Sequence, residues 1–219
     1  MTIRYERYSA DTSEHGITEQ LVDCYRNVFS DTPWNEWLKC GVCGKYWGRK
    51  DIEYIKDITF LHCGQPLVDF WPKEVVLSDI RNEIRSDISS CWLAFDKDRV
   101  IGFCWGYPAT TTALTEKMGL SIDFQLLGIN GAQKASFALQ DEVGVLAPYR
   151  GRKIAKELVR LRNKDFLNMG LDLGIVRTRE SPEPSITYLW YSKIGYRILA
   201  RYPNGDGRVV MGIHLRDIV

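Results

Sequence analysis

The sequence contains no apolar run that approaches the roughly 20 residues needed to span a bilayer. Met1 to Glu6 is too polar to open a secretory signal, so we expect a cytoplasmic protein with no membrane partner. An excess of charge is also missing, because 29 Lys and Arg residues nearly balance 28 Asp and Glu residues and leave a net charge of +1. This balance argues against nucleic acid as a partner, since broad electrostatic binding needs surplus positive charge.

A composition typical of disordered chains is absent as well. With 45% hydrophobic and 26% charged residues, the 219-residue chain can bury one substantial core. The length fits one domain over residues 1–219 that includes an insertion at about 38–72. The 6 cysteines occur in a chain too large to need disulfides, so we expect reduced thiols or metal ligands.

The residues from Asp141 to Leu158 have the order strand, loop and helix start. The apolar run breaks at Pro148, and the basic segment Arg150-Gly151-Arg152-Lys153 leads into a helical pattern. The first turn of a helix offers N–H groups without intrahelical partners and the positive end of the helix dipole, which together attract a phosphate. An ordinary helix start with solvated basic residues has the same pattern, so both interpretations stay open here.

The same segment resembles motif A of the GNAT superfamily of acyl-CoA-dependent N-acyltransferases, with the match at Arg150 to Ala155. The resemblance implies acetyl-CoA as co-substrate, bound through Val143, Val145, Arg150, Gly151, Arg152, Lys153, Ile154 and Ala155. Val143 to Val145 would pair with the pantetheine arm, and the Val145 N–H would face the thioester oxygen. Lys153 stands where the family usually has Gly; in helical geometry it would either bind a phosphate or crowd the cofactor.

A second segment, Tyr188 to Tyr196, resembles the late helix of the same family, which ends in Leu-Tyr-x-x-x-Gly-Phe. Gly195 is suited to end that helix and Tyr196 to begin the next strand. The resemblance implies that the phenol of Tyr191 protonates the departing thiolate, whereas a core aromatic is the alternative role. The family usually has Asn shortly before this helix, and this chain has Glu183-Pro184-Ser185.

A catalytic base is needed as well, because a primary amine holds its proton up to pH ~10.4. Glu142 lies on the strand beside the expected site and is the first candidate. Asp141 is expected to point to the opposite face and is the reserve candidate. A structural acid that pairs with a nearby Arg is the alternative for either residue.

The insertion carries a candidate metal site. Cys40-Gly41-Val42-Cys43-Gly44 has the form of a zinc knuckle, and Phe60-Leu61-His62-Cys63-Gly64 would be its partner, with Phe60 in place of the first Cys. The candidate ligands are therefore Cys40, Cys43, His62 and Cys63. Adjacent residues in an extended segment point opposite ways, so His62 and Cys63 can share a zinc ion only across a sharp turn. A decayed ribbon whose thiols merely pack is the alternative.

Apolar periodicity gives the expected order of elements. We expect strands at 3–8, 89–95, 100–107, from 136, and at 173–177, 196–202 and 208–215, and helices at 16–30, 73–86, from the basic loop to Gly170, and at 181–194. Trp34 and Trp37 follow the first helix and could line an acceptor site, although core packing is expected of at least one. The stretch 108–134 has no assignable pattern. Together these elements indicate an α/β (α+β) fold, which the resemblance makes a mixed, mostly antiparallel central sheet flanked by helices.

The leading hypothesis is an N-acetyltransferase that transfers the acetyl group of acetyl-CoA to a primary amine of a small molecule or protein, by direct attack in a ternary complex. Transfer of a longer acyl chain is one alternative. A catalytically silent acyl-CoA-binding regulator, or a ribbon that binds protein or nucleic acid on a GNAT-like fold, are the others. The sequence does not identify the amine.

Overall fold

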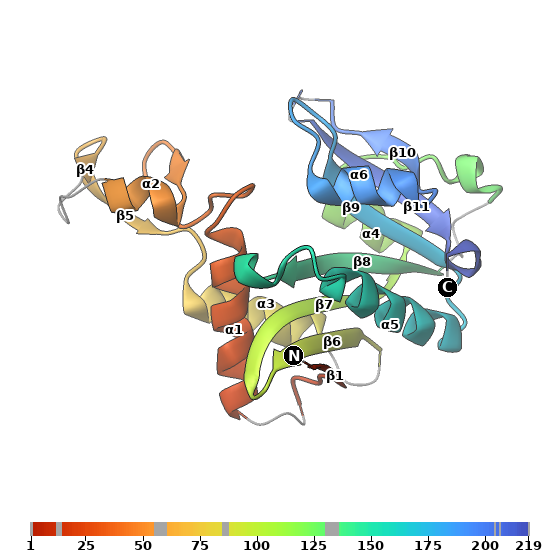
Figure 1. The fold of residues 1–219 in the computed structure, drawn as a ribbon. Coiled ribbons are helices and arrows are strands. Elements are labelled where there is room, and N and C mark those ends of the chain that lie inside the picture. Colours follow the sequence, from red (N-terminus) through yellow and green to blue (C-terminus); the bar gives the residue numbers. More distant parts are fainter. Residues whose placement is uncertain are drawn as a thin grey trace.

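The computed structural model describes residues 2–11, 15–54, 61–84, 88–129, 136–203, 205 and 207–218. These residues form a seven-stranded sheet flanked by helices and a separate four-stranded sheet (Figure 1). The strand order in the large sheet is β1-β6-β7-β8-β9-β11-β10, and every neighbouring pair is antiparallel except β8 and β9. The expected mixed, mostly antiparallel sheet is confirmed.

The strands of the large sheet lie close to their predicted positions. They are β1 (Ile3–Arg7), β6 (Ser90–Asp96), β7 (Arg99–Thr110), β8 (Ser136–Val145), β9 (Leu173–Arg179), β10 (Arg197–Arg201) and β11 (Arg208–His214). Most of β7 is buried from Val100 to Gly106 because helices cover both faces of the sheet, so this strand is a continuous apolar run without alternation.

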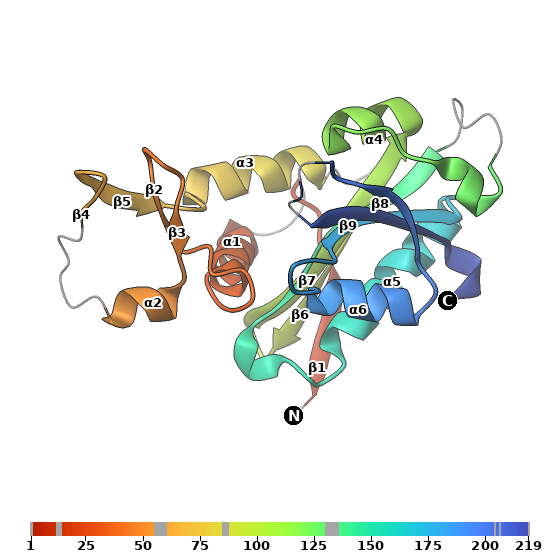
Figure 2. The same cartoon turned by 90° about the horizontal axis from the view of Figure 1, so that it is seen from above.

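Helices α1 (His15–Phe29), α3 (Lys73–Glu83) and α4 (Thr111–Met118) cover one face, and α5 (Ile154–Asn168) and α6 (Ile186–Lys193) cover the other (Figure 2). The helix predicted at 73–86 ends earlier, and residues 85–87 lie outside the described ranges. None of the helices within those ranges combines the length and apolarity that crossing a membrane requires.

Helix α6 begins later than predicted. The expected helix from Ser181 is wrong at its start, because Pro184 disfavours helical geometry at the residue before it. Ser185 instead caps the helix, since its Oγ accepts a hydrogen bond from the Tyr188 N–H at 3.1 Å. Residues 181–184 are thereby left as a loop at the end of β9.

The stretch that had no assignable pattern contains α4 and a 3₁₀ turn at Phe124–Leu127. Thr110 caps α4 by accepting from the Ala113 N–H at 3.2 Å, and Gly119 ends it in a left-handed conformation. Both capping residues could be read from the sequence. The helix is only 8 residues long, however, which is too short for apolar periodicity to identify.

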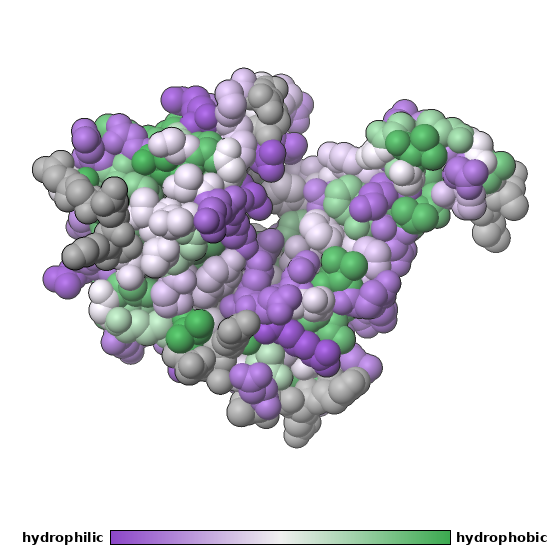
Figure 3. All heavy atoms as spheres, turned by 180° about the vertical axis from the view of Figure 1, so that it is seen from behind, coloured by the Kyte–Doolittle hydropathy of each residue, from purple (hydrophilic) through white to green (hydrophobic). Residues whose placement is uncertain are grey.

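The insertion forms the small sheet, which projects from the body of the molecule (Figures 1 and 3). It consists of β2 (Leu38–Cys40), β3 (Tyr46–Trp47), α2 (Arg49–Tyr54), β4 (Leu61–His62) and β5 (Gln65–Asp69). Phe60, which we aligned with a missing cysteine, lies outside the described residues. The projecting module exposes apolar side chains at Val42, Leu61 and Val68.

Arg26, near the end of α1, connects the insertion to the body. Its guanidinium binds Asp69 Oδ2 at 2.6 Å and the Trp71 carbonyl oxygen at 2.7 Å. The Arg49 guanidinium makes a second connection to Asn27 Oδ1 at 2.6 Å. These bonds fix the base of the module against the C-terminal end of α1.

Two irregularities open the large sheet around β8. Strands β8 and β9 pair at Ala138 and Leu139, and no further pair between them occurs in the described part of the chain. Toward β7, the register shifts so that Gln140 and Asp141 together oppose Gly106, which is a β-bulge. A Cβ at Gly106 would lie 2.2 Å from the Leu139 carbonyl oxygen, so the bulge requires glycine there. Beyond it, β8 separates from β9 and leaves one of its edges free.

Candidate active site

The first cavity, which we call the loop cavity, has a volume of about 460 Å³. It lies between the free end of β8, the loop before α5 and the first turns of α5 and α6. Its lining includes Val143, Val145, Arg150, Gly151, Lys153, Ile154 and Ala155, all of which were predicted to bind the cofactor. Arg152 was also predicted, but it is absent from the lining, and its guanidinium lies 5.4 Å from the centre of the Tyr149 ring.

Trp190 and Ser185 to Thr187 also line the loop cavity and were missed by the sequence analysis. The motif match drew attention to Tyr191, whereas the residue before it faces this cavity. Because successive residues of a helix are about 100° apart, a motif fixes which residues belong to α6 but leaves their orientation to packing.

The backbone of β8 presents donors to the loop cavity. The Leu146 N–H donates to the Ile101 carbonyl oxygen on β7 at 2.9 Å. Because N–H groups alternate between the two edges of a strand, those of Val143 and Val145 point away from β7, toward the edge that β9 has left. This edge can pair with an extended ligand.

Lys153 has a left-handed backbone with φ 64° and directly precedes α5. Our expectation that this lysine adopts helical geometry is therefore wrong. The left-handed region is disfavoured for side chains with a Cβ, which explains why a glycine would suit this position. The conformation turns the chain from the loop into the helix axis.

Arg150 is held by backbone oxygens. Its guanidinium donates to the carbonyl oxygens of Val145 at 3.0 Å, Thr32 at 2.7 Å and Val28 at 3.5 Å. These bonds connect the end of β8 to the end of α1 and the loop that follows it. Arg150 therefore organises the wall of the cavity, in addition to contributing positive charge there.

The second cavity, which we call the aromatic cavity, has a volume of about 470 Å³. Aromatic rings, acids and arginines line it: Tyr25, Phe29, Trp34, Tyr46, Trp71, Tyr191, Glu36, Asp141, Glu142, Arg177, Arg179 and Arg208. Trp34, Val143 and Thr187 line both cavities, so the two meet at the end of β8. Trp37, the other tryptophan proposed for an acceptor site, instead packs below the guanidinium groups of Arg26 and Arg49.

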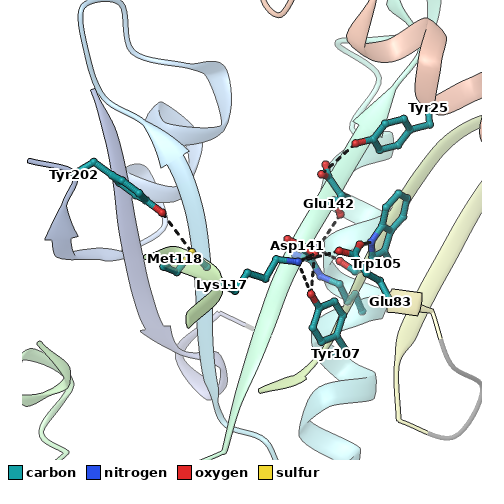
Figure 4. A network of polar contacts seen from close by, with 10 residues as sticks. Tyr25, Glu83, Trp105, Tyr107, Lys117, Met118, Asp141, Glu142 and Tyr202 are labelled. Atoms are coloured by element: carbon teal, nitrogen blue, oxygen red, sulfur yellow. Dashed lines mark hydrogen bonds and ion pairs between the residues drawn. The ribbon is translucent and has the colours of Figure 1, made fainter. Parts of the chain in front are cut away.

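Asp141 and Glu142 both line the aromatic cavity, so the expectation that they point to opposite faces is wrong. The β-bulge interrupts the alternation of side chains at this point. Asp141 Oδ2 accepts hydrogen bonds from Lys117 Nζ at 2.6 Å and from the Tyr107 hydroxyl at 3.1 Å, while Lys117 also binds Glu83 (Figure 4). Asp141 is thus a paired structural acid.

Glu142 is the acid without a cationic partner at hydrogen-bond distance in the described part of the chain. Its carboxylate accepts a hydrogen bond from the Tyr25 hydroxyl at 3.5 Å (Figure 4). Burial raises the pKa of Glu142 well above its usual value, and the negative charges of Asp141 and Glu83 raise it further. A carboxyl whose pKa is raised in this way can accept a proton near neutral pH.

Arg162 lies fully buried beneath the bulge. Its guanidinium donates to the carbonyl oxygens of Trp105 and Glu142, both at 3.1 Å, and to Gln140 Oε1 at 2.8 Å. The Tyr196 hydroxyl donates to the same Gln140 oxygen at 2.9 Å. The sequence analysis missed Arg162, although its place four residues after Leu158 on the apolar side of the helix was a signal that it is buried.

Tyr191 is 3% exposed and lines the aromatic cavity. Its ring stacks on Trp190, with centroids 5.2 Å apart, and contacts Tyr196 at 4.7 Å. Burial raises the pKa of its phenol, and the nearby Arg162 guanidinium opposes part of this rise. Tyr191 is thus a neutral proton donor at the cavity wall that also packs in the core.

The four predicted metal ligands come together in the insertion. The ligand atoms of Cys40, Cys43, His62 and Cys63 all lie within 4.8 Å of one another, and His62 Nδ1 is 3.5 Å from Cys43 Sγ and 3.4 Å from Cys63 Sγ. Cys63 has a left-handed backbone with φ 53°, which supplies the sharp turn that the shared site requires. The set of three thiols and one imidazole is typical of structural zinc sites.

We predict that Glu142→Gln changes how stability depends on pH. The folded pKa of Glu142 is raised, so its stabilising contribution is complete below its ordinary pKa of 4.5 and is lost as the pH rises through the folded value. The variant cannot ionise there and should gain stability over the parent at about pH 8, by up to ~1.4 kcal/mol for each unit of pKa shift. Urea unfolding across this pH range measures the difference.

Glu157→Gln is the control for this measurement. Its Arg160 partner lowers the pKa of Glu157, so the Glu157→Gln difference should have the opposite sign. Parallel stability profiles for the parent and Glu142→Gln would contradict the assignment of a raised pKa to Glu142.

Comparisons with known proteins show similarity in fold. No protein-family model and no curated protein matches the sequence significantly. The PaiA N-acetyltransferase of Thermoplasma acidophilum, solved with coenzyme A, is 15% identical with a TM-score of 0.57 over 98% of this chain and 99% of its own. The polyamine N-acetyltransferase of Drosophila melanogaster is 12% identical with a TM-score of 0.58 over 97% and 100%. A protein of Desulfovibrio desulfuricans described as a GNAT-family acetyltransferase is 10% identical with a TM-score of 0.56 over 98% and 99%. The chain therefore has the fold of the GNAT N-acetyltransferases.

Proposed function

We propose that this protein is an N-acetyltransferase that moves an acetyl group from acetyl-CoA to a primary amine by direct attack in a ternary complex. The observation that carries the proposal is the meeting of two cavities at the separated end of β8. One cavity is suited to an extended anionic ligand and the other holds acids and aromatic rings. A coenzyme A complex among the proteins of similar fold supports the same assignment.

The loop cavity is the proposed acetyl-CoA site. N–H groups of the first turn of α5 would bind the pyrophosphate, with the side chains of Arg150, Arg152 and Lys153 adding positive charge. The free edge of β8 at Val143 and Val145 would bind the pantetheine arm as an added strand. The Val145 N–H would then stabilise the negative charge that develops on the thioester oxygen.

Glu142 and Tyr191 are the proposed catalytic pair. Glu142 takes a proton from the amine, directly or through a water, so that the neutral nitrogen can attack the acetyl carbon. Tyr191 gives its phenolic proton to the sulfur as the carbon–sulfur bond breaks, which avoids release of a free thiolate. The two residues line the same cavity, on opposite sides of the gap between β8 and α6.

Binding without catalysis is the second candidate function, and the left-handed Lys153 favours it. A side chain at this position stands where the resembled motif has glycine, inside the proposed phosphate site. If this lysine crowds acetyl-CoA, the protein would serve as an acyl-CoA-binding regulator. Measuring binding and turnover separately distinguishes the two functions.

The catalytic role of Tyr191 is tested by Tyr191→Phe. The variant should bind acetyl-CoA as the parent does, because the ring and its stacking on Trp190 remain, while turnover falls by roughly 10²-fold for loss of a general acid. Calorimetry with acetyl-CoA and thiol release with a panel of amines and peptides provide the two readouts. Tyr196→Phe removes a neighbouring buried hydroxyl and should retain turnover within a few fold.

Equal turnover by Tyr191→Phe and the parent would sink the general-acid role. Tight binding of acetyl-CoA by a parent that acetylates none of the panel would favour the regulator instead. The absence of binding at millimolar acetyl-CoA would remove both functions.

The conformation of Lys153 leads to another expected outcome. Lys153→Gly relieves the left-handed strain and should raise the free energy of unfolding by about 1 kcal/mol. Lys97 also has a left-handed backbone, with φ 54° in the turn between β6 and β7, so Lys97→Gly is a matched control with a similar gain. Only Lys153→Gly should change acetyl-CoA affinity, upward if the side chain crowds the site and downward if its ammonium binds phosphate. Unchanged affinity in calorimetry would show that Lys153 does neither.

We also propose that Cys40, Cys43, His62 and Cys63 bind one structural zinc ion. Tetrahedral zinc with Zn–S bonds of about 2.3 Å holds its sulfur ligands about 3.8 Å apart, which agrees with the compact arrangement of these side chains. The ion would hold together β2, β4 and the turns beside them, which bury little apolar surface of their own.

Elemental analysis of protein purified without added metal should give one zinc per chain. Cys43→Ser should lose the ion and loosen the insertion, yet keep acetyl-CoA binding, because the loop cavity belongs to the large sheet. Cys24→Ala, which removes a buried thiol of α1, should retain zinc. Freshly purified, reduced parent protein without zinc would leave the decayed ribbon as the explanation.

A further inference from the structure

One wall of the aromatic cavity is positively charged. Arg177 and Arg179 of β9 and Arg208 of β11 line it. Because Arg177 and Arg179 are two residues apart on one strand, their side chains leave the same face of the sheet. They extend into the gap that opens where β9 separates from β8.

Two of these guanidinium groups lack partners. Within the described ranges, the Arg177 side chain makes no hydrogen bond or ion pair, and the Nε of Arg179 is buried without a hydrogen-bond acceptor. A buried donor without an acceptor is unfavourable, and such groups in a cavity wall commonly have a ligand or water as their partner. The wall therefore has unused donors that point to an absent acceptor.

The acids across the cavity do not neutralise this wall. Lys117 already pairs with Asp141 at 2.6 Å. Burial raises the pKa of both Glu36 and Glu142, which shifts these carboxyls toward their neutral forms. Glu36 is further held by the Trp71 Nε1–H, which donates to its Oε2 at 2.9 Å. The guanidinium groups are then the uncompensated charges of the cavity.

Aromatic rings separate the two ends of the cavity. Tyr25 and Trp71 pack edge to face with ring centroids 5.7 Å apart, and Phe29 lies 5.6 Å from Trp34. These rings give an apolar middle to a cavity whose β8 side carries Glu142 and whose β9 side carries arginines. A ligand that fits has an amine at one end, an acid group at the other and apolar atoms between them.

We infer that the acceptor carries an acid group, either a carboxylate or a phosphate, in addition to the amine that is acetylated, and that Arg177 and Arg179 bind this group. The inference rests on the proposed acetyl transfer and narrows it to anionic amines. A guanidinium binds either anion with two parallel hydrogen bonds, which also fixes its orientation. The acid group would thus hold the amine beside Glu142.

The experiment compares pairs of amines that differ in the acid group alone. Phenylalanine is paired with phenethylamine for a carboxylate, and phosphoethanolamine with ethanolamine for a phosphate. Calorimetry on protein saturated with coenzyme A measures binding, and thiol release with acetyl-CoA measures transfer. We expect at least one acid-bearing compound to bind about 10- to 100-fold more tightly than its partner, as charged hydrogen bonds allow.

Variants assign the preference to the arginines. Arg177→Gln and Arg179→Gln should each lower the affinity of the acid-bearing compound by about 10-fold or more, with coenzyme A and the acid-free amine affected less than about 2-fold. Arg160→Gln is the matched control, because Arg160 pairs with Glu157 on the exposed side of α5 and lines neither cavity.

The outcomes separate this inference from the proposed function. Acetylation of the acid-free amines as efficiently as their partners would overturn the inference and leave acetyl transfer intact. Arginine-dependent binding of an acid-bearing compound without transfer would support recognition of the acid group and count against catalysis. If neither acid-bearing compound binds at millimolar concentration, or if binding is unchanged in both arginine variants, the inference is wrong.

Discussion

Arg162 places a guanidinium inside the core, where its hydrogen bonds go to oxygens of β7 and β8. Burying this charge without a carboxylate at hand is costly, and the oxygens that bind it offset part of the cost. The bound oxygens belong to the residues around the bulge, at Trp105, Gln140 and Glu142. The bulge in turn places Asp141 and Glu142 on one cavity and precedes the separation of β8 from β9. Both cavities therefore depend on how α5 supports the middle of the sheet.

The insertion contributes to the aromatic cavity without forming its centre. Tyr46 of β3 lines the cavity, and Trp71 follows β5 directly. Trp71 is fixed from two sides, since its carbonyl oxygen accepts from Arg26 and its indole donates to Glu36. A change in how the small sheet sits on α1 would shift this ring and the carboxyl bound to it. The module can thus influence the shape of the cavity through contacts remote from its cysteines.

Local sequence determined much of what could be predicted. The strand, loop and helix around Arg150, the cap at Gly170 and the grouping of Cys40 with Cys63 follow from residues close in sequence or from one periodic pattern. The bulge could not be predicted, because it depends on Gly106 of β7 meeting Gln140 of β8. The same holds for Arg177 and Arg179, which resemble ordinary strand arginines until the neighbouring strand moves away. Trp190 was missed since side-chain orientation within α6 is decided by packing against β9.

The contacts of Arg150 have a mechanical consequence. A single guanidinium binds carbonyl oxygens at the end of β8, at the end of α1 and in the loop that leads to Trp34. The three segments are distant in sequence, and a shift of any one of them would break hydrogen bonds to the other two. Trp34 belongs to the walls of both cavities. A displacement of the loop before α5 is therefore transmitted to the neighbouring cavity as a movement of its wall, with no rearrangement of the sheet between them.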